Sequence, residues 1–404
     1  MTPVTPYLSR YATALLLGAA AATLAVNLAP GVYYDLVEYP LAMGALPEAL
    51  RLFAPGLTPG TAISSFFMGF FFLLLGKELW EAIILERGGL HGRRALVPLA
   101  LVLGGAVGAV LTWALLAGIF ETATEAADTP GWAFPLGGSI VISVLFGRKI
   151  FGPSHPALQF LLYLTVIEAI LGLVVAGLAA PVGLNLRPLW LLLPLGAALT
   201  GYHGITRPLV DPAMTERSRR RARHLWPWLV LGLIAWIGVS ASGLPPALGF
   251  LPILPAMPHG TRSFGLFSEA EGLLTDPLNR LEQWLMPAVV VVMLSFGLTG
   301  GAVDLGALGP TTLVTLAAFS IGKPLGILLV AGVLRLSGSV LPRGLTWRHI
   351  VLTAGLMGIG FATPLLTMQT TLPGGAMQEA ARLGLAFSIV LGPLVGSVAR
   401  VWKA

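Results

Sequence analysis

The chain has 404 residues, of which 56% are hydrophobic, only 10% are charged and none is cysteine. Soluble domains carry about 25% charged residues, so a chain with a mean hydropathy of +0.85 lacks the polar residues to cover a water-exposed surface and is expected to fold in a lipid bilayer. The missing cysteines exclude disulfides, thiolate metal sites and iron–sulfur clusters, and the net charge of +6 is spread over short connections between apolar runs, which argues against nucleic-acid binding.

Apolar stretches of membrane-spanning length recur along the whole chain. A helix needs about 20 residues to cross the hydrocarbon core, and fewer where it is broken inside a bundle. We therefore predict one all-α transmembrane domain, residues 1–404, with about twelve helices. They lie near residues 11–30, 61–85, 95–118, 133–147, 157–180, 188–205, 226–242, 244–257, 285–300, 310–334, 349–371 and 383–400. The first run follows Arg10 and is long enough to span, so we interpret it as a helix and not as a cleaved signal peptide.

Basic residues gather in the connections after the second, fourth, sixth and tenth spans. These connections hold Arg87, Arg93, Arg94, Arg148, Lys149, Arg217, Arg219, Arg220, Arg221, Arg223, Arg335, Arg343 and Arg348. The opposite set holds Asp35, Glu38, Glu121, Glu125, Asp128 and Asp304. The positive-inside rule then predicts that both termini are cytoplasmic. The connection 206–225 divides the chain into halves of about 1–205 and 226–404, and its run 217–223 is interpreted as an orientation signal that contacts lipid headgroups.

Two spans break the helix pattern at corresponding places in the two halves. The fourth carries Pro135, Gly137 and Gly138, and the eleventh carries Gly358, Gly360 and Pro364. Proline cannot donate an intrahelical hydrogen bond, so backbone groups are freed inside the membrane and need other partners. Simple kinks would explain either segment alone, but the matched pair indicates an inverted-repeat transporter with a site near the midplane.

Two ionisable residues lie deep in apolar spans, where each is costly unless it is paired or hydrated. Glu168 is near the middle of the fifth span, and Lys323 is near the middle of the tenth. One acid and one base from opposite halves lead to the hypothesis that they meet. Such a pair titrates as a unit and can exchange protons, although a purely structural ion pair is the alternative.

A third acid, Glu78, stands beside Lys77 toward the expected cytoplasmic end of the second span. It fits either a funnel or pH-sensing residue, or a side chain that reaches the water interface. No Walker A, zinc-protease or nucleophile-elbow motif occurs, and no nucleophile and base stand at usable spacing. We therefore expect neither an enzyme nor a cofactor.

Several stretches resemble the bacterial NhaA-type sodium/proton antiporters. They are residues 33–38, 71–76, 131–135, 321–326 (Ile-Gly-Lys-Pro-Leu-Gly) and 358–361 (Gly-Ile-Gly-Phe), so the likeness covers nearly the whole chain. The resemblance implies a bacterial inner-membrane protein with an inverted-repeat fold and two broken helices that cross near the ion site. It also implies that Lys323 pairs with the carboxylate of Glu168, and that Glu78 is a carboxylate of the cytoplasmic funnel.

This chain departs from the family pattern at three acidic positions. The family's consecutive Asp-Asp pair is Glu168-Ala169 here, its Thr-Asp in the fourth span is Gly138-Ser139, and an acid of the second span is Ser65. A sodium ion needs several oxygen ligands. Those that remain for a site at Glu168 are the hydroxyls of Ser139, Thr165 and Thr363 and the freed backbone carbonyls.

The leading functional interpretation is exchange of sodium or another monovalent cation for protons by alternating access. Loss of three acids motivates an alternative, in which a degenerate antiporter fold acts as a structural or regulatory membrane subunit. A porter of anions is a third class, because Lys323 and the N-termini of broken helices carry positive charge. The sequence leaves open whether the chain forms a homodimer or joins a membrane complex.

Overall fold

The computed structural model describes residues 4–41, 57–85, 88–120, 131–179, 187–209, 224–260, 264–274, 276–338 and 344–402. Within these ranges the chain is helical, apart from connections and one isolated bridge between Val4 and Ser268. The basic run 217–223 lies outside the described residues, as do Arg87, Arg343, Glu121, Glu125 and Asp128.

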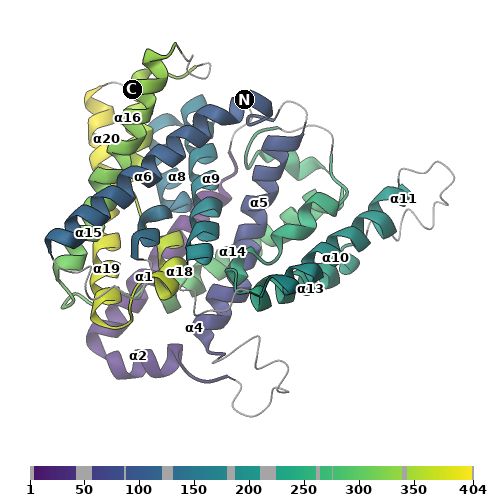
Figure 1. Cartoon of the computed structure of the whole chain (residues 1–404), viewed down its shortest axis with the longest axis horizontal. Coiled ribbons are helices and arrows are strands. Elements are labelled where there is room, and N and C mark those ends of the chain that lie inside the picture. Colours follow the sequence, from purple (N-terminus) through teal and green to yellow (C-terminus); the bar gives the residue numbers. More distant parts are fainter. Residues whose placement is uncertain are drawn as a thin grey trace.

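Eight helical segments are long and apolar enough to cross a membrane (Figure 1). They are α1 (Tyr7–Leu28), α4 to α5 (Pro59–Ile84), the segment Gly92–Ile119 that contains α6 (Leu96–Ile119), Gly131–Phe151 with α8 (Ile140–Phe151), α9 (Pro156–Ala179), α14 (Pro277–Gly300), Pro310–Leu336 with α15 (Pro310–Ala317) and α16 (Lys323–Leu336), and Ala376–Val401 with α19 (Ala376–Ser388) and α20 (Leu391–Val401). A ninth span is the bent pair α17 (Trp347–Met357) and α18 (Ala362–Thr371).

Three further segments occupy the places of the other expected spans. They are the helical stretch 188–209, which contains α10 (Leu192–Gly201), and two shorter apolar segments, α13 (Trp226–Ser242) and Pro246–Ala256. The first two pack side by side at one edge of the bundle (Figure 1). The prediction of an all-α membrane protein with about twelve helical segments therefore agrees with the structure, although α13 and Pro246–Ala256 are shorter than a full span.

Two of the expected spans differ in detail. The segment 244–257 is not an α-helix but two 3₁₀ turns, Pro246–Leu248 and Leu251–Ala256, because its repeated prolines remove backbone donors. The ninth span begins at Pro277 rather than near 285. Asp276 caps this helix by accepting from the backbone N–H of Asn279, and Pro277 occupies the first helical position.

Small residues bring two helix pairs into backbone contact. On α6, a Cβ at Gly104 would lie 2.8 Å from the carbonyl oxygen of Gly326 in α16. Where α1 meets α14, a Cβ at Gly18 would lie 2.9 Å from the backbone nitrogen of Leu298. Side chains at either contact would push the helices apart, so these glycines set the spacing of the bundle.

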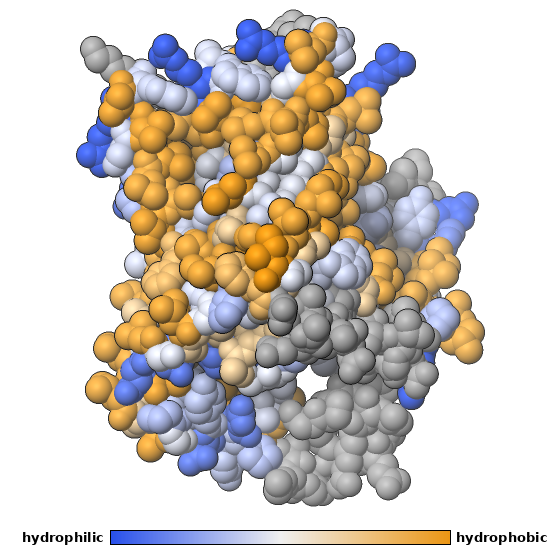
Figure 2. Space-filling view, turned by 60° about the vertical axis from the view of Figure 1, so that its left-hand side comes forward, coloured by the Kyte–Doolittle hydropathy of each residue, from blue (hydrophilic) through white to orange (hydrophobic). Residues whose placement is uncertain are grey.

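Both ends of the chain lie at the same end of the molecule (Figure 1). The guanidinium of Arg148 donates to the carbonyl oxygens of Val4 and Thr5 at 3.2 and 3.0 Å, and Arg348 donates to that of Trp402 at 3.1 Å. The C-terminal end of α8, which holds Arg148, and the N-terminal end of α17, which holds Arg348, therefore share one end of the bundle with both termini. In Figure 2 apolar side chains cover most of the visible flank, and hydrophilic ones gather toward its upper and lower edges.

Candidate ion and proton site

The buried acid and base of the sequence meet in the structure. The Nζ of Lys323 lies 2.5 Å from Oε1 of Glu168 and donates a second hydrogen bond to the carbonyl oxygen of Gly137 at 2.6 Å. Both side chains are almost completely buried, and the ammonium also lies 4.3 Å from the centre of the Phe319 ring. A buried charge pair needs such additional partners to offset the loss of hydration.

Local helix irregularity positions the lysine. Lys323 begins α16 directly after a π-helical turn, Ala318–Gly322, and Pro324 follows it. Proline has no N–H and crowds the carbonyl four residues earlier, so the regular ladder cannot pass through this point. Pro324 accounts for this wider turn, but the turn was not predicted from the sequence.

The two broken helices cross at their interruptions and hydrogen-bond to each other. The backbone N–H of Ser139 donates to the carbonyl oxygen of Ile359 at 3.0 Å, and the N–H of Thr363 donates to that of Gly138 at 3.3 Å. Each break thus satisfies a group that the other leaves free, which is the reciprocal relation expected of two inverted repeats. Gly137 and Gly138 lie between the turn Gly131–Leu136 and α8, and Gly358 and Gly360 lie between α17 and α18.

The prolines flank these breaks and do not lie inside them. Pro135 is in the short 3₁₀ turn Gly131–Leu136 before the first break, and Pro364 is in the first turn of α18 after the second. A Cβ at Gly137 would lie 2.9 Å from Cγ2 of Thr363, so glycine is needed for the two breaks to approach this closely. Farther along the crossing, the hydroxyl of Ser143 donates to the carbonyl oxygen of Leu356 at 2.8 Å.

Unpaired oxygens surround the acid–base pair. Glu168 Oε2 and Ser139 Oγ are buried without a hydrogen-bond partner among the residues that the structure describes. Thr165 differs, because its hydroxyl donates within its own helix to the carbonyls of Leu161 and Leu162. Thr363 is buried at the crossing. A cation or proton at this site would therefore find its free acceptors first on Glu168 and Ser139.

Gly138 makes room for the carboxylate of Glu168. A Cβ at Gly138 would lie 2.6 Å from Oε2 of Glu168 and 3.0 Å from its carboxyl carbon. Glu168 and Gly138, which both belong to departures noted in the sequence, are therefore sterically coupled. Ala169 and Ser65 do not add an acid to the site: Ala169 is buried, and Ser65 contributes a backbone carbonyl oxygen to the indole N–H of Trp236.

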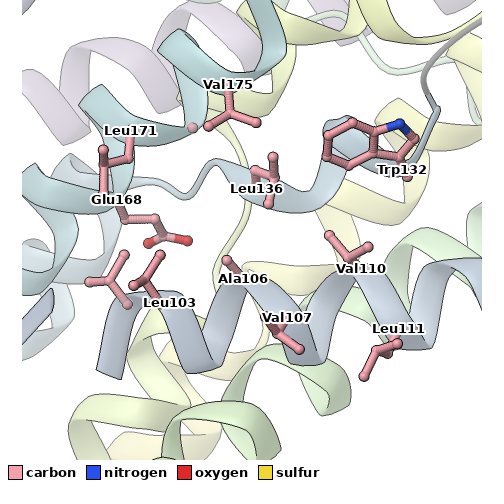
Figure 3. Close-up of a pocket in the computed structure, with 12 residues that line it drawn as sticks. Leu103, Ala106, Val107, Val110, Leu111, Trp132, Leu136, Glu168, Leu171 and Val175 are labelled. Atoms are coloured by element: carbon pink, nitrogen blue, oxygen red, sulfur yellow. The ribbon is translucent and has the colours of Figure 1, made fainter. Parts of the chain in front are cut away.

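An apolar cavity of about 330 Å³ opens beside the carboxylate (Figure 3). Glu168 is the single charged residue in its lining, and the rest of the lining is apolar. Figure 3 shows the carboxylate directed into the space between α9 and α6, with Trp132 and Leu136 across from it. The cavity lies next to the ion pair but carries almost no polar surface that would hold a hydrated ion.

A second group of buried charges lies between α5, α14 and the segment 264–274. Lys77 is at its centre. Its Nζ lies 3.4 Å from Glu78, 3.0 Å from Glu81, 2.5 Å from Glu271 and 2.7 Å from Glu282. All five side chains are at most 5% exposed. We call these five residues the Lys77 cluster. Of the two interpretations of Glu78, the one in which its side chain reaches the water interface is therefore wrong.

Three members of the Lys77 cluster, Glu81, Glu271 and Glu282, were not predicted from the sequence. Glu81 follows Lys77 by four residues, which is the spacing of a helical ion pair, and was the local signal. Glu282 lies before residue 285, where the ninth span was expected to begin, whereas Asp276 and Pro277 mark the start of the helix in the structure. Glu271 lies in a connection and carried no signal.

Three carboxylates of the Lys77 cluster stand close enough to hold a metal ion. Oxygens of Glu78, Glu271 and Glu282 lie within 4.8 Å of one another. The ammonium of Lys77 contacts all three, however, and so occupies the position that a cation would take. Burial raises the pKa of Glu271 to about 8 against the opposing pull of Lys77, and the charges of Glu282 and Glu81 add to the rise.

The Lys77 cluster is tied to the N-terminal residues through one backbone segment. The N–H of Phe267 donates to Oε2 of Glu78 at 2.5 Å, and its carbonyl oxygen accepts from the N–H of Thr5 at 2.8 Å. Phe267 has a positive φ of 51°, which is unusual for a residue with a bulky side chain. The cluster therefore lies toward the end of the molecule that holds both termini.

Crossed, interrupted helices around a buried acid–base pair define a secondary transporter with an ion site inside the membrane. The family model described as Na+/H+ antiporter 1 matches residues 8–399. The chain belongs to this family.

Individual relatives agree with the family model. The Na(+)/H(+) antiporter NhaA of Jannaschia sp. (strain CCS1) is 36% identical over 357 residues, which cover 86% of this chain and 85% of the relative. The Na(+)/H(+) antiporter NhaA of Geobacter sulfurreducens is 30% identical and covers 94% and 93% of the two chains. Among solved structures, the sodium proton antiporter MjNhaP1 from Methanocaldococcus jannaschii aligns over 97% of each chain with 15% identity and a TM-score of 0.49.

Proposed function

We propose that this protein exchanges sodium for protons by alternating access, with Glu168 as the carrier carboxylate. Family membership supports the reaction, because the matching family and its relatives are named as sodium/proton antiporters. The observation that carries the residue assignment is the geometry of the Glu168 carboxylate. One oxygen is held by Lys323, and the other is buried beside the crossing of the broken helices with no hydrogen-bond partner among the described residues.

The arrangement makes sodium and the Lys323 ammonium competitors for one carboxylate. A sodium ion would be bound by Oε2 of Glu168, the hydroxyl of Ser139 and the carbonyl oxygens freed at the breaks. As the ion takes over the carboxylate, the ammonium loses its anionic partner and its proton leaves. A proton that returns from the other side restores the pair and releases sodium. The Glu168 carboxylate therefore pairs in turn with the sodium ion and with the protonated Lys323, so that binding of one substrate releases the other.

Alternating access requires the two breaks to move together. Their reciprocal hydrogen bonds, Ser139 to Ile359 and Thr363 to Gly138, couple the half-helices on either side of the site. Loading of Glu168 changes the charge at the crossing, so the loaded and unloaded sites favour different arrangements of the same two helices. Thr165 and Thr363 would complete the site in one of these arrangements.

The Lys77 cluster suits a role in pH response at the entrance for cations. Its four carboxylates face a single ammonium, so the cluster holds excess negative charge when all are ionised. Protonation of Glu271 near neutral pH lowers that excess. A less negative entrance attracts fewer cations, so exchange would slow as the pH falls.

We further propose that the chain resides in the bacterial inner membrane with both termini in the cytoplasm. The positive-inside rule supports this orientation, since Arg148 and Arg348 share one end of the bundle with the two termini. The Lys77 cluster would then face the cytoplasm. The alternative of a structural subunit without transport is not favoured, because the acid–base pair and both breaks are intact.

Flux measurements on reconstituted protein test the proposal. Wild-type vesicles should move protons in response to a sodium gradient, and Glu168→Gln should abolish that movement. Glu38→Gln, which changes an exposed acid outside the spans, is the matched control and should behave as wild type. If wild-type vesicles responded to no gradient of sodium, lithium or potassium, the exchange function would be refuted. If Glu168→Gln retained full exchange, only the assignment of the carrier would fail.

A further inference from the structure

The cavity beside Glu168 has the composition of a ligand site and not of an ion path. Its volume of about 330 Å³ falls at the lower end of the range for small-molecule pockets. The lining comes from α6, α9 and the turn Gly131–Leu136, and it is apolar except for one carboxylate. Such a site takes a small apolar body, of the size of one aromatic ring or a short alkyl chain.

The single polar group of the cavity is a buried acceptor without a partner. Glu168 is 4% exposed, and its Oε2 has no hydrogen bond among the described residues. Figure 3 shows its carboxylate directed into the cavity. A buried carboxylate oxygen in this state favours a donor, and a charged donor gains most because the surroundings are apolar.

The cavity is open to the lipid side of the bundle. Leu103, Val107 and Leu111 of α6 line it and are between 51 and 63% exposed, and Trp132 on the opposite wall is 46% exposed. In a membrane such exposed apolar residues face acyl chains. A molecule that partitions into the bilayer can thus enter without passing through water.

From these three features we infer that the cavity binds lipophilic organic ammonium ions from the membrane. The apolar body packs between α6 and α9, and the ammonium donates a hydrogen bond to Oε2 of Glu168. The bound cation occupies the free face of the proposed carrier carboxylate, so it blocks that face against sodium. A fatty acyl chain is the competing occupant, because it would fill the same volume without needing the carboxylate.

Equilibrium binding to protein in lipid nanodiscs tests the inference without any need for exchange. The probe is phenethylammonium, and the comparison is phenethyl alcohol, which has the same body and a neutral head. Binding to empty nanodiscs is subtracted from both. Wild type should bind the ammonium saturably and at least about tenfold more tightly than the alcohol, as expected for one charge-assisted hydrogen bond in an apolar site. Equal binding of the two probes would overturn the inference in favour of an apolar occupant.

Two variants locate the bound probe. Ala106→Phe fills the cavity from α6, and Glu168→Gln keeps its shape but removes the charge. Each should weaken ammonium binding at least about tenfold. Ala114→Phe makes the same change on an exposed position of α6 outside the cavity lining and should bind as wild type. Undiminished binding by monodisperse Ala106→Phe would place the probe elsewhere and refute the site.

The binding experiment and the flux experiment test the ligand site and the proposed transport independently of each other. Saturable ammonium binding in a protein without exchange would leave the ligand site standing and refute the proposed transport. Normal exchange in a protein that binds both probes equally would support the proposed transport and refute the ligand site.

Discussion

Gly138 and Glu168 are matched in size across the crossing of the broken helices. The Glu168 carboxylate fills the space that a Cβ on residue 138 would need, with only 2.6 Å between that Cβ and Oε2. The position of the Glu168 carboxylate therefore depends on the absence of a side chain at Gly138. This relation explains how the chain keeps a carboxylate at the crossing although the family's acidic pattern has changed around it.

Gly138→Ala should displace the carrier carboxylate. The added methyl group overlaps Oε2, and the neighbouring backbone is fixed by the hydrogen bond from Thr363, so the side chain and not the main chain must give way. Overpacking of this kind costs typically about 1–3 kcal/mol, so we expect the exchange rate to fall roughly tenfold. The measurement is sodium-driven proton flux in vesicles.

The control for that change is Gly196→Ala in α10. A Cβ there meets no atom within 4 Å, so exchange should be unaffected. If Gly138→Ala transported as well as Gly196→Ala, the Glu168 carboxylate would not need the position described here.

Removal of either partner of the buried ion pair should destabilise the protein strongly. Glu168→Gln leaves the Lys323 ammonium buried without its anionic partner, and Lys323→Met leaves the Glu168 carboxylate without its cationic partner. Each change is expected to lower the free energy of unfolding by about 3–5 kcal/mol. The double variant removes both charges, so its loss should be smaller than the sum of the two single losses. Thermal unfolding in detergent measures all four proteins. Strict additivity would contradict direct contact between the pair.

Ser139 and Ser143 should respond in opposite ways to replacement by alanine. Ser139 Oγ is buried with no hydrogen-bond partner in the described part of the chain, so Ser139→Ala should leave the thermal midpoint unchanged or raise it while it raises the KM for sodium. Ser143 donates to the carbonyl oxygen of Leu356, so Ser143→Ala should cost about 1 kcal/mol and leave the KM as it is. An unchanged KM in Ser139→Ala would remove this hydroxyl from the sodium site.

Glu271 should make the folded protein less stable as the pH rises. Its pKa is raised from 4.5 to about 8 in the fold, so between these values the folded state binds a proton that the unfolded state has lost. The contribution of this group to stability is therefore complete at low pH and is lost as the pH approaches 8. Thermal midpoints across this range measure the trend.

Glu271→Gln tests which residue causes the trend, because it removes the titrating group but not its shape. The slope of the midpoint against pH should become shallower in this variant. Glu269→Gln, an exposed acid on the same short helix, should keep the wild-type slope. The same slope in all three proteins would exclude Glu271 as the source.

Local sequence features were enough to predict the architecture. Apolar length located most spans, and the Gly and Pro residues around positions 138 and 360 located both breaks, because each depends on a few neighbouring residues. The errors have local causes as well. The prolines of 244–257 turned an apolar run into 3₁₀ turns, and the helix cap at Asp276 was overlooked.

The membrane fold, the two interrupted helices and the presence of one acid and one base in the apolar interior all follow from the amino-acid sequence. Which side chains meet depends on the packing of the helices. Glu271 and Glu282 join Lys77 from 194 and more residues away, and Gly138 makes room for Glu168 across the helix crossing. The physical reason is that hydropathy and helix breaking are properties of short segments, whereas the distance between two side chains depends on how separate helices pack.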